Sequence, residues 1–155
     1  MEGIRKISII ALLAVFVMSL GTISASAQIG WGDTLDDAIL LYHPGGGNSQ
    51  ASAPIESTSD YDFFLIDNRY GGDTLHYSLQ LYSPPGLNYD MQLITMDRNG
   101  RITEVKEVHD SGAGKRDAIY APLANGHSLY VKVQSHGAYD YDPYNFYVLD
   151  FIKLI

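Results

Sequence analysis

One stretch of the chain decides its fold: Ser59-Asp60-Tyr61-Asp62-Phe63-Phe64-Leu65-Ile66-Asp67. Two acids enter this stretch, large apolar residues run through its middle, and a third acid closes it. Aromatic and β-branched residues bounded by Asp and Asn are typical of a β-strand that is buried on at least one face. We therefore expect a core strand here, with a pair of carboxylates at its start.

Working outward from this stretch, short alternating segments predict further strands. They lie at residues 76–83, 90–97, 101–108, 117–121, 129–133 and 145–152, with a loop or weak edge strand at 49–58. The turn Asp97-Arg98-Asn99-Gly100 is a strong hairpin signal, because Asn-Gly tolerates the positive φ of such turns. Short strands separated by turns at this spacing predict an all-β sandwich.

One helix is predicted ahead of the core strand, over residues 33–42. Its apolar residues recur at i, i+3, i+4 and i+7: Leu35, Ala38, Ile39 and Tyr42. Asp33 or Thr34 can cap its start, and the run Pro44-Gly45-Gly46-Gly47 ends it.

The N-terminus has the pattern of a secretory signal peptide over residues 1–27. Arg5 and Lys6 precede an apolar run at 7–20, and Ala25-Ser26-Ala27 offers the small residues that a signal peptidase requires. A retained membrane anchor is the alternative, but the apolar run is short for a bilayer. We expect cleavage before Gln28, leaving a secreted, extracellular domain over residues 28–155.

The charge and the absence of cysteine exclude several classes of function. The whole chain has a formal net charge of −8, and loss of residues 1–27, with one acid and two bases, makes it about −9. Such a surface repels nucleic acid and anionic lipid, so neither is an expected partner. With no cysteine, the domain has neither disulfides nor thiol chemistry, and packing or a bound metal must hold it together.

The order of motifs resembles that of the bacterial pre-peptidase C-terminal domain, whose relatives include the collagen-binding domains of clostridial collagenases. The motifs that carry the resemblance are Gly32-Asp33-Thr34-Leu35, Asp60-Tyr61-Asp62-Phe63-Phe64, the segment 90–100, Tyr120-Ala121-Pro122, Asn125-Gly126, Tyr130-Val131-Lys132-Val133 and Tyr147-x-Leu149-x-Phe151. The resemblance covers nearly all of residues 28–155. It implies an antiparallel, jelly-roll-like β-sandwich with the short N-terminal helix in front.

The resemblance also implies a calcium site, because some members of the family bind calcium between the lead-in segment and the Asp-x-Asp strand. The matching residues are Asp33, Asp60 and Asp62, with Asp36 or Asp37 nearby. Calcium takes six to eight oxygen ligands, so these carboxylates would need backbone carbonyls and water to complete its shell. The alternative is structural: Asp33 caps a helix and Asp60 caps a turn.

Tyrosines near the C-terminus predict a binding surface. Tyr139, Tyr141 and Tyr144 are interleaved with aspartates, and Trp31 could belong to the same kind of surface. Tyrosine contributes contact area with few torsions to freeze, which suits the recognition of a protein or sugar. The alternative is that Tyr144 belongs to the last strand, that the other tyrosines shield a sheet edge, and that Trp31 fastens the N-terminus to the sandwich.

We predict that the protein is not an enzyme. The histidines, His43, His76, His109, His127 and His136, lack the spacings of a metal enzyme, and Ser111 is not in a Gly-x-Ser-x-Gly turn. The expected function is that of a secreted, calcium-stabilised module that attaches to an extracellular protein or polysaccharide. Two alternatives stay open: a folding helper or inhibitor of a separate secreted protease, and a small hydrolase that uses aspartate carboxylates.

Overall fold

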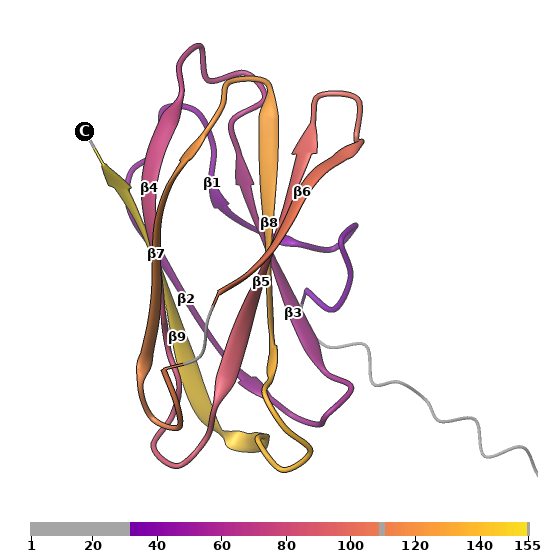
Figure 1. Ribbon diagram of the computed structural model, residues 1–155, viewed down its shortest axis with the longest axis vertical. Helices are drawn as coiled ribbons and strands as arrows, with labels where there is room; N and C mark the ends of the chain where they lie inside the picture. The colour runs from indigo at the N-terminus through magenta and orange to yellow at the C-terminus, as the bar shows by residue number, and fades with distance from the viewer. Residues whose placement is uncertain (1–31, 109–110, 155) are drawn as a thin grey trace, which may run out of the picture.

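The computed structural model describes residues 32–108 and 111–154, which form two β-sheets packed face to face (Figure 1). The strands are β1 (Ile39–Tyr42), β2 (Ser49–Ile55), β3 (Tyr61–Asp67), β4 (Leu75–Tyr82), β5 (Tyr89–Asp97), β6 (Ile102–Val108), β7 (Arg116–Leu123), β8 (His127–Ser135) and β9 (Asp142–Leu154). One sheet has the order β1-β3-β8-β5-β6 and the other the order β2-β9-β4-β7. The prediction of an all-β sandwich is confirmed.

The core strand predicted from the sequence is β3. Its alternation places Phe64 and Ile66 in the core with no exposed area, and Asp62 faces the same way. Phe63 and Leu65 lie on the opposite, outer face and are half-buried. β3 pairs antiparallel with β8, so that Phe64 lies opposite Val131. β3 therefore contributes buried side chains to the core and also positions the carboxylates at its start.

Apolar side chains from both sheets fill the space between the layers. The largest fully buried ones are Tyr89, Tyr147, Phe64, Phe151, Ile55, Ile66, Leu79, Leu81, Met91, Leu129, Leu149 and Val131. The Tyr147 ring packs edge-on against Phe64, with centroids 6.4 Å apart, and against Tyr89 at 5.9 Å. Each buried aromatic or branched side chain contributes about 1.5–3 kcal/mol. This packing holds the sandwich together without disulfides.

The predicted helix over residues 33–42 is wrong. The chain makes a single turn, in which the Asp37 N–H donates to the Thr34 carbonyl oxygen at 3.2 Å, and then enters β1. β1 pairs with β3, so that Ile39 lies opposite Phe64. An isolated short helix is marginal in water, whereas pairing with β3 satisfies the backbone and buries the apolar residues of this segment. Among the residues described, none forms a helix.

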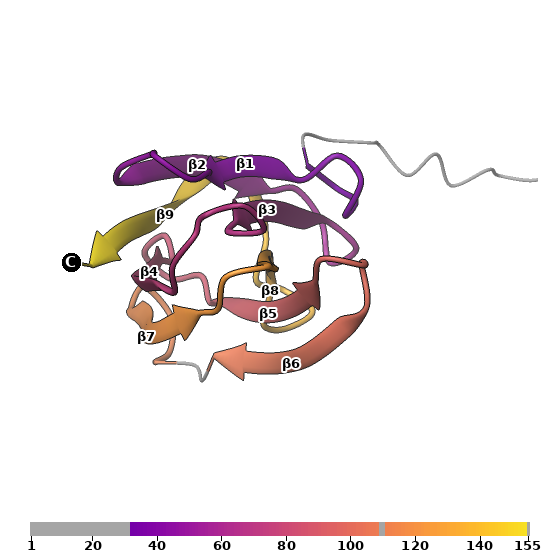
Figure 2. The ribbon, with the colours of Figure 1, turned by 90° about the horizontal axis from the view of Figure 1, so that it is seen from above.

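The strand pairing also differs in one respect from a purely antiparallel sandwich. β1 runs parallel to β3, while every other paired strand runs antiparallel to its neighbour within the described ranges. The weak strand expected at 49–58 is β2, which lies at the edge of the four-stranded sheet as predicted. Figure 2 shows the two layers end-on, with β1 and β2 at the same side of the molecule.

Two sequence predictions fall outside the described residues. These are the signal peptide at 1–27 and the contribution of Trp31 to a binding surface. Within residues 32–108 and 111–154 there is no helix with the length and apolar character needed to cross a membrane.

Candidate metal centre

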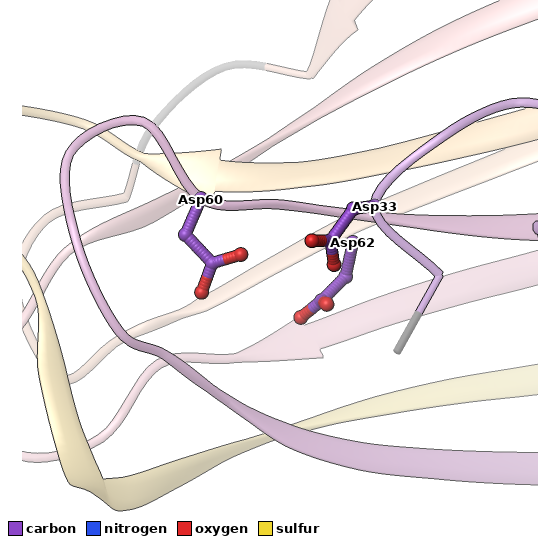
Figure 3. A group of neighbouring side chains, drawn as sticks. All are labelled: Asp33, Asp60 and Asp62. Carbon is purple, nitrogen blue, oxygen red and sulfur yellow. The ribbon is translucent and has the colours of Figure 1, made fainter. Parts of the chain in front are cut away.

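Three aspartates converge where the lead-in segment, the described residues 32–38 ahead of β1, passes the start of β3. Asp33 comes from the lead-in, Asp60 directly precedes β3, and Asp62 is the second residue of that strand. One carboxylate oxygen from each lies within 4.8 Å of those of the other two. Figure 3 shows the three side chains around one small region. The sequence predicted all three residues.

Gly32 fixes the position of Asp33. Its carbonyl oxygen accepts a hydrogen bond of 2.7 Å from the N–H of Phe63, which ties the lead-in to β3. Its φ is +85°, a conformation that residues with a side chain rarely adopt. A Cβ here would lie 2.8 Å from the Ile39 Cδ1 and 3.2 Å from the Phe63 carbonyl oxygen. Glycine thus allows the lead-in to approach β3 closely enough to deliver Asp33.

Asp60 combines a structural contact with an unfavourable environment. Its Oδ2 accepts a 2.6 Å hydrogen bond from the backbone N–H of Glu56, which closes the turn before β3. Burial raises the pKa of the Asp60 carboxyl; the Glu56 N–H opposes that rise, and the negative charge of Asp33 adds to it. The turn-capping role considered from the sequence is therefore real, and it coexists with membership of the cluster.

Asp62 is the buried member of the cluster, with 4% of its surface exposed. Tyr147, on the opposite sheet, donates its phenolic hydrogen to the Asp62 Oδ2 at 2.5 Å. The pKa of Asp62 is raised to about 7: burial is the main cause, the charges of Asp60, Asp33 and Glu56 add to the rise, and the Tyr147 hydrogen bond opposes it. A carboxylate in this place costs free energy unless a cation accompanies it.

The arrangement fits a calcium ion. Calcium binds oxygen at about 2.3–2.6 Å, so two ligands on opposite sides of the ion are separated by about 4.6–5.2 Å. The 4.8 Å spread of the three carboxylates falls in this range. Carboxylates are the hard ligands that calcium prefers, and three of them leave room for carbonyl oxygens and water. The donor set and its spacing therefore suit this ion.

The fourth predicted ligand does not join the other three. Asp36 is exposed and lies outside the group of converging carboxylates. Its neighbour Asp37, the stated alternative, accepts a 3.0 Å hydrogen bond from the Thr34 hydroxyl. Neither Asp36 nor Asp37 is therefore among the three converging carboxylates.

Tyr139 and Tyr141 lie in the loop before β9, whereas Tyr144 lies within β9, as the alternative interpretation of the sequence had it. Tyr139 is 91% exposed and Tyr144 is 86% exposed, whereas Tyr141 is 42% exposed. Asp142 shapes this segment by accepting hydrogen bonds of 2.8 Å from the Tyr144 N–H and from the Asn145 side-chain amide. The rings of Tyr139 and Tyr144 therefore pack little against the domain, one from the loop and one from the start of β9.

Sequence reasoning missed Phe146, which is 57% exposed. Tyr147, Leu149 and Phe151 alternate along the last strand, and all three are buried. Strict alternation then requires Phe146 to face outward. Tyr120, on β7, is a further exposed ring that the sequence analysis did not single out.

The burial of Asp62 decides whether this cluster could act as a pair of catalytic carboxylates. Asp62 lies beneath the surface and is hydrogen-bonded to a buried tyrosine, so a polymeric substrate cannot contact it. A pair of catalytic carboxylates must flank the scissile bond on an accessible surface. Asp62 does not meet this condition, whereas the three carboxylates together could hold a metal ion.

Some solved structures of other proteins are similar in structure to this chain. No family model matches the chain, and no curated protein matches its sequence. The pre-peptidase C-terminal domain of a collagenase from Bacillus anthracis matches with a TM-score of 0.48 and 11% identity, over 74% of this chain and 93% of that one.

The fold is similar to that domain. That domain belongs to the family that the sequence motifs resemble. The periplasmic inhibitor of g-type lysozyme PliG from Aeromonas hydrophila matches with a TM-score of 0.49 and 7% identity, over 76% of this chain and 96% of that one. A CBM35 from Cellvibrio japonicus Abf62 matches with a TM-score of 0.37 and 17% identity, over 75% of this chain and 82% of that one.

Proposed function

We propose that this protein is an exported, non-enzymatic binding domain that calcium stabilises. The observation that carries the proposal is the convergence of Asp33, Asp60 and Asp62, with one carboxylate buried against the core. Three neighbouring carboxylates repel one another, and their partial burial strengthens that repulsion. A divalent cation would offset this repulsion. Because carboxylates from both segments would coordinate it, the cation would also link the lead-in segment to β3.

The place of the cluster explains how calcium would act on the whole domain. Asp33 belongs to the lead-in, whereas Asp62 is joined through Tyr147 to β9 in the opposite sheet. An ion held by both would connect the N-terminal segment to the two layers of the sandwich. Because the unfolded chain has no such site, the free energy of calcium binding would add directly to the stability of the fold.

The binding role is proposed for the exposed aromatic segment, which comprises Tyr139, Tyr141, Tyr144 and Phe146. The large exposed fractions of these rings provide apolar area that a partner can cover, and hydroxyl groups that can donate hydrogen bonds to it. Aromatic residues are enriched where proteins recognise other molecules. The proposed partner is an extracellular protein or polysaccharide, in keeping with the signal-peptide pattern at residues 1–27.

Thermal unfolding with and without calcium tests the metal. The melting temperature in EDTA would be compared with that in millimolar calcium, with magnesium as the control ion. At a hundredfold excess over the dissociation constant, calcium should stabilise the fold by about 2.7 kcal/mol, a shift of several degrees. Identical melts in EDTA and in calcium would contradict the proposed site.

Co-sedimentation with insoluble polymers tests the binding role. The protein would be mixed with collagen, chitin and bacterial cell wall, and the bound fraction measured against a variant in which Tyr139, Tyr144 and Phe146 are serine. We expect retention on one of these polymers and its loss in the variant. Equal retention of both proteins would remove the aromatic segment from the binding surface.

A further inference from the structure

β6 forms one edge of the five-stranded sheet and leaves its outer side open. It is the last strand in the order β1-β3-β8-β5-β6, and Figure 2 shows it at the outer margin of the molecule. Its side chains are exposed from Ile102 through Glu107, and Ile102 and Val105 are 58% and 54% exposed. An edge of this kind presents backbone N–H and C=O groups that can pair with another strand.

The other three sheet edges carry features that discourage such pairing. β1 has only four residues, β2 contains Pro54 and β7 contains Pro122. Proline has no N–H to donate, and short strands offer few hydrogen bonds. β6 contains neither proline nor glycine, and its one register irregularity lies at its start, opposite Thr95 and Met96. It is the edge most suited to pairing within the described part of the chain.

The geometry of a two-fold axis limits the ways in which two copies of β6 can pair. A two-fold axis perpendicular to the sheet keeps every side chain on its own face of the sheet. Two residues that lie opposite each other in the two copies must then have residue numbers that differ by an even number, so one residue, the centre of the pairing, lies opposite itself. Near the middle of β6 only three centres satisfy this condition, namely Glu104, Val105 and Lys106. A centre at Glu104 or at Lys106 would place that charge against itself.

We propose that β6 pairs antiparallel with β6 of a second copy of this chain, centred on Val105. In this register Glu104 of each copy lies opposite Lys106 of the other, so two pairs of opposite charge form. Opposite charges across antiparallel strands stabilise the pairing, and like charges weaken it. Charged residues usually protect an edge strand, and here they would reject unrelated strands while complementing a second copy.

The outer face of the sheet supports the same centre. A row of apolar residues crosses all five strands in register and ends at Val105: Leu40, Leu65, Tyr130, Ile94 and Val105. Antiparallel sheets ordinarily expose polar residues on the solvent side, so an unbroken apolar row is unusual. Pairing at Val105 would bring the two valines together and continue the row across both copies.

Charge reversal tests the proposal by sedimentation equilibrium over protein concentrations from about 1 μM to 1 mM, a range that covers weak dimers. The wild type is expected to dimerise at the upper end. Glu104→Lys and Lys106→Glu should each raise the dimer dissociation constant about tenfold or more. In either variant residues 104 and 106 carry the same charge, so both of the 104–106 pairs across the dimer become repulsive. The double variant Glu104→Lys/Lys106→Glu should restore dimerisation, because the opposite charges face each other again.

A matched control lies on the same strand. Glu107→Lys changes the net charge as Glu104→Lys does, but in this register residue 107 opposes Thr103, so its effect should be much smaller. Unchanged circular-dichroism spectra and melts would establish that all variants are folded. A wild type that stays monomeric throughout, or a double variant no better than the single ones, would overturn the proposal. Repeating the series in EDTA keeps its outcome separate from that of the calcium site.

Discussion

The phenolic oxygen of Tyr147 lies 2.5 Å from the Oδ2 of Asp62 and donates a hydrogen bond to it across the interior of the sandwich. Tyr147 belongs to the four-stranded sheet and Asp62 to the five-stranded sheet. Burial raises the pKa of the tyrosine well above its usual value, and the charge of Asp62 raises it further, so the phenol keeps its proton. The candidate metal centre is therefore attached to the core of the domain, and substitutions there should affect both calcium binding and stability.

Replacing Asp62 with asparagine should separate these two effects. The amide oxygen can still accept the hydrogen bond of Tyr147, but the buried negative charge is gone. In EDTA at about pH 8 we expect Asp62→Asn to melt several degrees above the wild type, because burying a charge without a cation is costly. In calcium the wild type should gain stability and the variant should gain little. Asp36→Asn, at an exposed aspartate outside the cluster, serves as the control and should leave both melts unchanged.

The pH dependence of stability should change sign with calcium. The folded protein holds the pKa of Asp62 at about 7, above the ordinary value of 3.8. Without metal, this group favours the folded state fully below about pH 4, and the advantage, on the order of 4 kcal/mol, is lost as the pH rises through about 7. Calcium binds the ionised form, so its stabilising effect should grow over the same interval. Denaturant unfolding between about pH 5 and pH 8, with calcium and with EDTA, measures both slopes.

The converging aspartates show what the sequence could predict of the site. Asp60 and Asp62 are two residues apart on a strand, so alternation alone puts them on one face. Asp33 was placed with them through the family resemblance, since no local pattern relates the lead-in to β3. Asp36 was named only because it lies near Asp33 in the sequence, and it does not join the converging carboxylates.

The lead-in segment and the sheet edges show why the sequence could not predict the remaining features of the fold. Leu35, Ala38, Ile39 and Tyr42 fit a helical period, but pairing of this segment with β3 outweighs it, and that pairing depends on a strand far along the chain. For the same reason the sequence predicts β6 as a strand without indicating that it lies at an edge. Phe146, in contrast, could have been assigned to the outer face from the alternation around Tyr147 and Leu149.

Gly32→Ala should weaken calcium binding without changing any ligand. The φ of +85° and the 2.8 Å approach of an added Cβ to Ile39 would force the lead-in away from β3. Because Asp33 is the next residue, its carboxylate would move with the backbone. We expect calcium affinity, measured by isothermal titration calorimetry, to fall about tenfold or more, and stability to fall by about 1–3 kcal/mol. Gly45→Ala also changes a glycine of positive φ, but its Cβ would meet no atom within 4 Å, so the calcium affinity of that variant should not change.

Tyr147→Phe should destabilise the fold by leaving Asp62 without its donor. The ring would still pack on Phe64 and Tyr89, so the loss reports the hydroxyl group alone. A buried carboxylate that loses a hydrogen bond costs about 1–3 kcal/mol. The pKa of Asp62 should rise further, because the Tyr147 hydrogen bond is what lowers it. The deficit in urea unfolding should shrink at low pH, where Asp62 is protonated, and an equal deficit at all pH values would contradict this explanation.

Removing the exposed rings should abolish attachment and leave the fold intact. Tyr139, Tyr144 and Phe146 are open to solvent, so replacing all three with serine takes little apolar area out of the core. The melting temperature should stay within a few degrees, since exposed substitutions usually change stability by less than about 0.5 kcal/mol each. Retention on the polymer that holds the wild type should be lost, because truncating the aromatic residues of a binding surface commonly costs about 2 kcal/mol or more per residue.

Tyr70→Ser removes another exposed tyrosine, from the turn between β3 and β4, and should bind like the wild type. If Tyr70→Ser were as defective as the triple variant, the binding surface would extend well beyond the segment that leads into β9.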